Sequence, residues 1–94
     1  MSTTRSMIIT GGTGRIGRVL ARHFAEGGWQ VVVPSRSGQR IEELRASLNA
    51  EAAERLTGPV LDLTEEGSVS ALMAWLGKRG LAPVALVNGA RDLG

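Results

Sequence analysis

The feature that most constrains the fold of this chain is a glycine-rich segment directly after its first apolar run. The sequence IITGGTGRIG, residues 8–17, joins a short β-branched stretch to a segment whose apolar residues recur at helical spacing. Three of its glycines, Gly11, Gly14 and Gly17, are three residues apart. A strand, a glycine turn and a helix in this order predict a loop that holds nucleotide phosphates at the helix N-terminus. A turn of the same composition without a ligand is the alternative interpretation.

The rest of the chain alternates between strand-like and helix-like patterns. Strands are expected at residues 7–10, 30–34, 60–63 and 84–87. Helices are expected from the glycine loop to Gly27-Gly28, around residues 41–48, and around residues 69–76 with an end at Gly77 or Gly80. Residues 49–57 either continue the second helix or form a further turn. The βαβαβαβ order predicts a single α/β domain over residues 1–94, with a parallel sheet and helices on both of its faces.

Two of the expected helices carry apolar residues at a spacing typical of one apolar face. The first helix has Ile16, Val19, Leu20 and Phe24, and the third has Val69, Leu72, Met73 and Leu76. The arginines at positions 18 and 22 share a helix face and are expected to be solvated.

Charge and composition exclude several classes of function. The formal net charge of +2 is too small to argue for nucleic-acid binding. Cysteine is absent and His23 is the only histidine, so neither a disulfide nor a metal site is expected. No apolar stretch approaches the ~18 residues that a membrane-spanning helix needs, and residues 1–6 lack the apolar centre of a secretory signal. A cytoplasmic protein is therefore expected.

The glycine loop resembles the nucleotide-binding loop of the short-chain dehydrogenase/reductase family. The family pattern is T-G-x-x-x-G-x-G, and this chain has Arg15 in place of the middle glycine. That form is similar to the loop of the pteridine-reductase-like branch, where the arginine approaches a phosphate of the cofactor. The resemblance covers residues 7–91. Together with right-handed crossovers, it implies a Rossmann-type three-layer αβα fold, with about four parallel strands in the order 3-2-1-4, incomplete relative to the family.

The segment after the second strand distinguishes between the two nicotinamide dinucleotides. A carboxylate at this place would bind the ribose 2′-hydroxyl of NAD(H), whereas an arginine suits the 2′-phosphate of NADP(H). The chain has Ser35-Arg36-Ser37 here, and no acidic residue occurs between Gln30 and Arg40. The triplet is similar to the H-R-S of pteridine-reductase-like proteins, so NADP(H) is favoured over NAD(H). A solvated loop arginine is the alternative.

Two further segments resemble cofactor contacts of the family. Asp62-Leu63 ends the third expected strand, where the aspartate would accept a hydrogen bond from the adenine amino group and the leucine would flank the ring; alternatively, Asp62 or Thr64 caps the next helix. After the fourth strand, Asn88-Gly89-Ala90 resembles the family's N-N-A. The resemblance thus implies cofactor contacts at Gly11, Thr13, Gly14, Arg15, Ile16, Gly17, Ser35, Arg36, Ser37, Asp62, Leu63, Asn88, Gly89 and Ala90.

No catalytic residue can be named in this chain. The family uses a tyrosine as the proton donor and a nearby lysine, but the chain has no tyrosine and its only lysine is Lys78. Three interpretations follow. The chain is the dinucleotide-binding half of an NADP(H)-dependent oxidoreductase acting on a small carbonyl or imine substrate, with the catalytic half elsewhere. It is a non-catalytic dinucleotide-binding or partner protein. Or it is a scaffold with an empty loop. The first is preferred, as part of a homo-oligomer or with a complementing chain.

Overall fold

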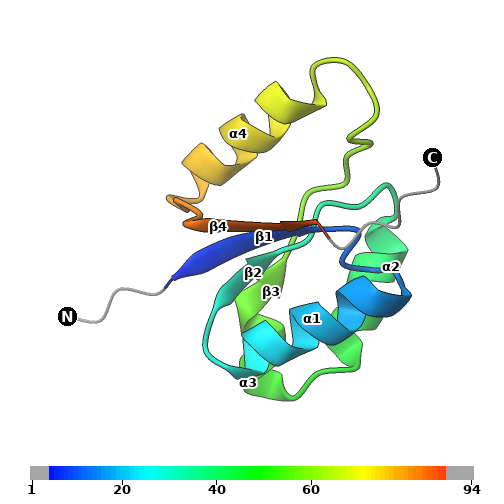
Figure 1. The fold of residues 1–94 in the computed structure, drawn as a ribbon, viewed down its shortest axis with the longest axis vertical. Coiled ribbons are helices and arrows are strands. Elements are labelled where there is room, and N and C mark those ends of the chain that lie inside the picture. Colours follow the sequence, from blue (N-terminus) through cyan, green and yellow to red (C-terminus); the bar gives the residue numbers. More distant parts are fainter. Residues whose placement is uncertain (1–4, 89–94) are drawn as a thin grey trace.

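The computed structural model describes residues 5–88, which form one parallel sheet with helices on both faces (Figure 1). The elements are β1 (Ser6–Thr10), α1 (Arg15–Glu26), β2 (Gln30–Val32), α2 (Gly38–Ala46), α3 (Ala50–Arg55), β3 (Leu56–Thr57), α4 (Ser68–Lys78) and β4 (Ala85–Asn88). The strand order is β3-β2-β1-β4, and every pairing is parallel. This confirms the predicted Rossmann-type α/β fold.

The three layers are visible in Figure 1, where α1, α2 and α3 lie on one face of the sheet and α4 lies on the other. The valine run of β2 explains why both faces can be covered. Val31 and Val33 belong to the main core cluster with Ala21 and Ala25 of α1, whereas Val32 packs with α4. Successive strand residues point to opposite faces, so an uninterrupted apolar run serves two cores.

The apolar spacing of α1 predicts its core-facing side only in part. The fully buried residues of α1 are Gly17, Ala21 and Ala25, a row of small residues four apart. Leu20 and Phe24 flank this row in the core, but Ile16 and Val19 are 66% and 64% exposed. Small side chains let the helix axis approach the sheet closely. The same division occurs in α4, where Leu72 and Leu76 are buried and Val69 and Met73 are exposed.

The third strand is misplaced in the sequence prediction. The structure has β3 at Leu56–Thr57 instead of residues 60–63, and Val60 makes only an isolated bridge with Ser35. The chain continues alongside β2 between these two places, since Val33 donates to the Thr57 carbonyl and Ser35 donates to that of Pro59. Pro59 has no N–H that could donate to the Val33 carbonyl, so the ladder is interrupted there.

The region between α2 and β3 forms a separate helix, α3, so residues 49–57 do not continue the second helix. The Asn49 side chain accepts a hydrogen bond of 2.8 Å from the Ala52 amide and so caps α3. Helix α1 ends at Gly27-Gly28 as predicted, and α4 ends just before Gly80.

Candidate functional site

The glycine loop connects β1 to α1 at the carboxyl edge of the sheet. Gly11 has φ of +69°, a backbone conformation that residues with a Cβ seldom adopt. A Cβ on Gly17 would overlap the Gly11 carbonyl oxygen and lie 2.8 Å from the Gly12 Cα, so α1 can begin this close to the loop only with glycine. Gly12 is buried against Val33, which directly follows β2. The loop is therefore shaped by turn geometry at one glycine and by close packing at others.

The start of α1 leaves backbone donors exposed to the loop. Gly14 is the N-cap residue and provides no side-chain cap, and no acidic residue occurs in the first turn. The first intrahelical bond runs from the Arg18 amide to the Gly14 carbonyl at 2.9 Å. The amides of Arg15, Ile16 and Gly17 consequently lack an acceptor within the helix, and together with the helix dipole they favour an anion.

A polar cavity of about 460 Å³ lies beside the loop, between the end of β2 and the start of α2. Its lining residues are Thr13, Ser35, Arg36, Ser37 and Arg40. The Ser35 Oγ accepts a hydrogen bond of 3.2 Å from the Ser37 amide, and the Ser37 Oγ caps α2 by accepting one from the Arg40 amide. Both hydroxyl groups still have a hydrogen to donate. The structure thus brings the predicted Ser-Arg-Ser triplet and Thr13 to one cavity.

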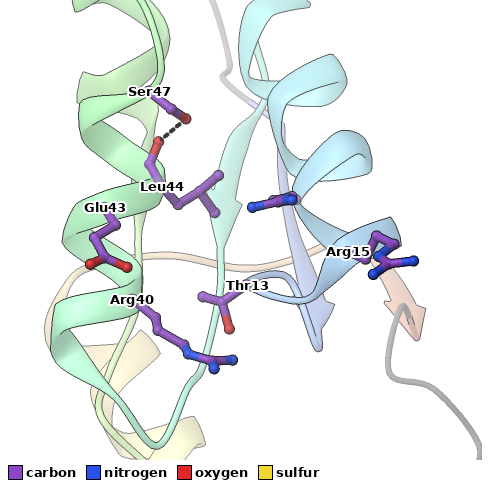
Figure 2. A pocket seen from close by; sticks show the side chains of 7 residues that line it. Thr13, Arg15, Arg40, Glu43, Leu44 and Ser47 are labelled. Atoms are coloured by element: carbon purple, nitrogen blue, oxygen red, sulfur yellow. Dashed lines mark hydrogen bonds between the residues drawn. The ribbon is translucent and has the colours of Figure 1, made fainter.

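A second polar cavity of about 350 Å³ adjoins the first and shares Thr13 and Arg40 with it. Figure 2 shows this cavity between the glycine loop and α2, with Arg40 extending from α2 toward Thr13 and with Arg15 at the start of α1. Arg18 also lines it, although the sequence pattern predicts a solvated residue there. Glu43 is the acidic residue of the lining, and its carboxylate accepts a hydrogen bond of 3.2 Å from Gln39.

Four arginines around these cavities form what we call the arginine cluster, namely Arg15, Arg18, Arg36 and Arg40. Within residues 5–88 their guanidinium groups make no hydrogen bond, ion pair or ring contact. Every other arginine of that range is engaged. Arg22, Arg45 and Arg55 pair with Glu26, Glu42 and Glu51, while Arg5 and Arg79 lie over Trp29 and Trp75. The unpaired positive charge is therefore concentrated at the glycine loop.

Asp62 closes a turn after the isolated bridge instead of capping a helix. Its Oδ1 accepts hydrogen bonds from the Thr64 hydroxyl at 2.6 Å and from the Thr64 amide at 2.9 Å. These bonds, and to a smaller extent the charge of Arg36, hold the pKa of Asp62 below its ordinary value of 3.8. The next helix, α4, has Gly67 as its N-cap and no side-chain cap, so the alternative that Asp62 or Thr64 caps it is wrong.

The remaining predicted contact residues occupy different surroundings. Leu63 packs partly buried against the cluster of Val32, Leu72 and Leu76, while Ile16 is exposed at the start of α1. Asn88 ends β4, and its Oδ1 accepts a hydrogen bond of 2.9 Å from the Thr10 hydroxyl at the end of β1. Gly89 and Ala90 lie outside the described residues.

Sequence reasoning missed Arg40 and Thr10. A signal for Arg40 was present, because Ser37 is an N-cap residue type and the residue three positions after an N-cap lies in the first turn of the helix. No comparable pattern marks Thr10, whose partner is 78 positions away.

The structure also bears on metal and membrane sites. Among residues 5–88 there is no group of three or more histidine, aspartate or glutamate side chains that could hold a metal ion. None of the helices in that part of the chain has the length and apolar character required to cross a bilayer.

Known protein families offer a direct comparison with this geometry. The model of the short chain dehydrogenase family matches residues 5–91. The chain is 40% identical over 75 residues to the chloroplastic chlorophyll(ide) b reductase NOL of Arabidopsis thaliana, and 33% identical over 84 residues to sulfoacetaldehyde reductase 2 of Chromohalobacter salexigens. These alignments cover 80% and 89% of this chain but only 22% and 32% of the relatives. The chain thus spans about a fifth to a third of their length.

Solved structures also match nearly the whole of this chain over about a third of their own length. A menthone neomenthol reductase from Mentha piperita superposes with a TM-score of 0.84 and 27% identity, covering 97% of this chain and 33% of that protein. An actinorhodin polyketide ketoreductase with NADPH gives a TM-score of 0.82 and 28% identity, covering 100% of this chain and 36% of its own.

Proposed function

The chain belongs to the short-chain dehydrogenase family, and on that premise we propose that it is the dinucleotide-binding part of an NADP(H)-dependent oxidoreductase. The observation that carries this proposal is the arginine cluster, which places unpaired positive charge around a glycine loop in which α1 begins without a side-chain cap. Similar structures solved with NADPH or NADP support the cofactor assignment. We treat residues 1–94 as one partial domain of this kind.

The pyrophosphate of the cofactor would bind at the glycine loop. The amides of Arg15, Ile16 and Gly17 lack intrahelical acceptors, and Gly11 and Gly14 leave the backbone accessible because they carry no side chains. Thr13 lines both adjoining cavities and has a hydroxyl group that can donate to a phosphate oxygen.

The adenosine end of the cofactor would extend past the end of β2. Arg36 is the charged residue of the Ser-Arg-Ser triplet. Among residues 5–88, none of those that line its cavity has a carboxylate that could bind a ribose 2′-hydroxyl in the manner of NAD sites. The hydroxyl groups of Ser35 and Ser37 would donate to the 2′-phosphate. The Asp62 carboxylate would accept a hydrogen bond from the adenine amino group, beside Leu63.

The nicotinamide end would lie beyond β1 and β4. We propose contacts from Asn88, which is fixed by its bond to Thr10, and from Gly89 and Ala90. The nicotinamide supplies hydride chemistry when the cofactor is bound. The chain itself provides no tyrosine for proton transfer, and Lys78 ends α4, so the residues that act on a carbonyl or imine substrate would come from outside these 94 residues.

An apolar groove supports the idea that further polypeptide completes the domain. The groove measures about 330 Å³ and lies between α4 and β4, where its lining includes Met73, Val84 and Leu86. Val84 and Leu86 are 70% and 68% exposed, and β4 pairs only with β1 in the described sheet. Exposed apolar side chains beside an open strand edge are typical of an interaction surface. The occupant would be the segment that carries the catalytic residues, whether in a longer form of the protein or in a complementing chain.

Calorimetric titration of the 94-residue chain with NADPH and with NADH tests the cofactor assignment. We expect tighter binding of NADPH, and equal affinities would contradict it. The proposal of a completing segment is tested separately, by measuring NADPH oxidation with carbonyl substrates before and after a catalytic segment from a related reductase is added. Binding without restored turnover would favour the second candidate function, a non-catalytic dinucleotide-binding or partner protein.

Composition supports a proposal for the cellular setting of this function. A chain without cysteine has no need of an oxidising compartment, so we propose the cytoplasm as its location. A homo-oligomer is the alternative to a completing segment, because association of two copies would also cover the exposed apolar groove.

A further inference from the structure

We propose that Arg40 is a second specificity-determining residue for NADP(H), and that its guanidinium group binds the 2′-phosphate together with that of Arg36. This inference rests on the proposed function. It assigns to the first turn of α2 a role that the Ser-Arg-Ser triplet does not reveal, since Arg40 lies outside that triplet. Two guanidinium groups, instead of one, would then decide between NADP(H) and NAD(H).

The position of Arg40 is the first argument. It lines the cavity that contains Ser35, Arg36 and Ser37, and also the adjoining cavity beneath the glycine loop. Figure 2 shows its side chain extending from α2 toward Thr13. A group bound in either cavity, or across both, would contact it.

The local backbone fixes where the side chain starts. The Arg40 amide donates to the Ser37 Oγ at 3.2 Å, and this bond caps α2. Ser37 therefore has two functions, as a lining residue and as the cap that holds the first turn in place. Because the backbone of Arg40 is held in the helix, ligand binding would order only the side chain, which limits the entropy cost of binding.

The electrostatic environment is the second argument. Of the carboxylates on α2, Glu42 pairs with Arg45 at 3.2 Å, whereas Glu43 accepts a hydrogen bond from Gln39 and makes no ion pair with Arg40. Within the described residues the Arg40 guanidinium group makes no hydrogen bond or ion pair. Arg36 lines the same cavity and makes no ion pair either, although its charge contributes to the lowered pKa of Asp62. Unpaired like charges around one cavity attract an anion, and binding of the anion reduces the repulsion between them.

The chemistry of the ligand matches this arrangement. A phosphate monoester carries a charge of about −1.5 to −2 near pH 7 and presents three acceptor oxygens, so it can engage two guanidinium groups at once. NADH has a hydroxyl group at the same ribose position and presents no such charge. A second arginine would therefore contribute to binding of NADPH and hardly affect NADH.

The experiment is a titration of the full 94-residue chain with NADPH and NADH, comparing wild type, Arg40→Gln, Arg40→Lys and the control Lys78→Gln. Glutamine keeps helix propensity, and lysine keeps the charge without the guanidinium geometry. Lys78 ends α4 on the opposite face of the sheet, so its variant removes the same charge far from the cavity. Circular dichroism confirms folding of each variant.

We expect Arg40→Gln to weaken NADPH binding about tenfold and to leave NADH binding unchanged. The NADPH affinity of Arg40→Lys should lie between those of wild type and Arg40→Gln, and that of Lys78→Gln should match wild type.

A gain-of-affinity variant provides an independent arm. Glu43 is the acidic residue lining the cavity that Arg40 shares with the glycine loop, so Glu43→Gln should strengthen NADPH binding a few fold and by more than it strengthens NADH binding. Equal gains for the two dinucleotides would contradict a role for this charge at the 2′-phosphate.

The outcomes separate this inference from the proposed function. A wild type that prefers NADPH, together with an Arg40→Gln variant of unchanged NADPH affinity, overturns the role of Arg40 and leaves the proposed function intact. Equal losses for NADPH and NADH would also overturn it, since they would show that Arg40 only maintains α2 or contacts a phosphate common to both dinucleotides. A wild type that binds neither dinucleotide, or both equally, overturns the proposed cofactor and this inference together.

Discussion

Thr10 donates a hydrogen bond of 2.9 Å from its hydroxyl group to the Asn88 Oδ1, joining the last residues of β1 and β4. The two residues are also directly paired in the parallel ladder. A side-chain bond thus reinforces the backbone pairing at the carboxyl edge of the sheet, next to the glycine loop. It positions the amide that we propose to contact the cofactor.

Replacing Thr10 by valine should weaken this edge without changing its shape. Valine keeps the β-branched form and removes the donor, so we expect a loss of about 0.5–1 kcal/mol in the free energy of unfolding, measured by urea denaturation. Hydrogen exchange at the β4 amides should accelerate as well. Thr57→Val is the matched control, because Thr57 lies in β3 and its side chain makes no hydrogen bond within residues 5–88. Equal losses in both variants would show that the Thr10 bond contributes nothing.

Removing Arg36 should reduce the preference for NADPH. A charge-assisted contact between guanidinium and phosphate is worth about 1.5–3 kcal/mol, so Arg36→Ala should lower NADPH affinity about tenfold or more and leave NADH affinity unchanged. Calorimetric titration of both dinucleotides measures this directly. An unchanged preference would indicate that Arg36 is merely solvated.

A methyl group added at Gly17 should disrupt both stability and the loop. The new Cβ would overlap the Gly11 carbonyl oxygen, a backbone atom that can move only if α1 shifts. We expect Gly17→Ala to lose about 1–3 kcal/mol of stability and to lose dinucleotide binding. Gly77→Ala is the control, since nothing lies within 4 Å of its Cβ position in α4. The free energy of unfolding of that variant, measured by thermal denaturation, should rise by up to about 1 kcal/mol, because alanine is the better helix former. A stable, binding-competent Gly17→Ala chain would contradict the close packing.

The Asp62 carboxyl should titrate below its ordinary pKa of 3.8. Its charged form accepts two bonds from Thr64, so the stabilisation it provides is complete above pH 3.8 and is lost as the pH falls through the lower folded-state value. An NMR titration of the Asp62 side-chain carbon should show this. Thr64→Val should raise the Asp62 pKa more than Arg36→Gln does, because the hydroxyl bond is the larger cause. The reverse order would identify Arg36 as the main partner.

The 94-residue chain should show no reductase turnover even when NADPH is bound. Hydride transfer to a carbonyl builds negative charge on oxygen, and the chain has no tyrosine to neutralise it. The assay follows NADPH absorbance with ketones, quinones and pterins, with and without an added catalytic segment. Turnover by the isolated chain would contradict the proposed division of functions.

The sequence alone determined the alternation of strands and helices and the parallel sheet, although not the separate helix α3. Alternating apolar segments and the glycine spacing are local patterns, and right-handed crossovers leave few topologies open to them. The sequence also indicated the loop from Gly11 to Gly17, because strand, turn and helix follow one another directly there.

Only the tertiary structure decided which residues meet across the fold. It placed β3 at Leu56–Thr57, because the strand is defined by which residues pair with Val31 and Val32 of β2, and no periodicity contains that register. It buried the small residues of α1 and left Ile16 exposed, because the distance between helix and sheet is set by packing instead of hydrophobicity. It brought Arg40 to the cavity of Arg36, because a side chain's neighbours depend on how helices dock on the sheet. Local pattern specifies elements, whereas contacts arise only when the elements pack together.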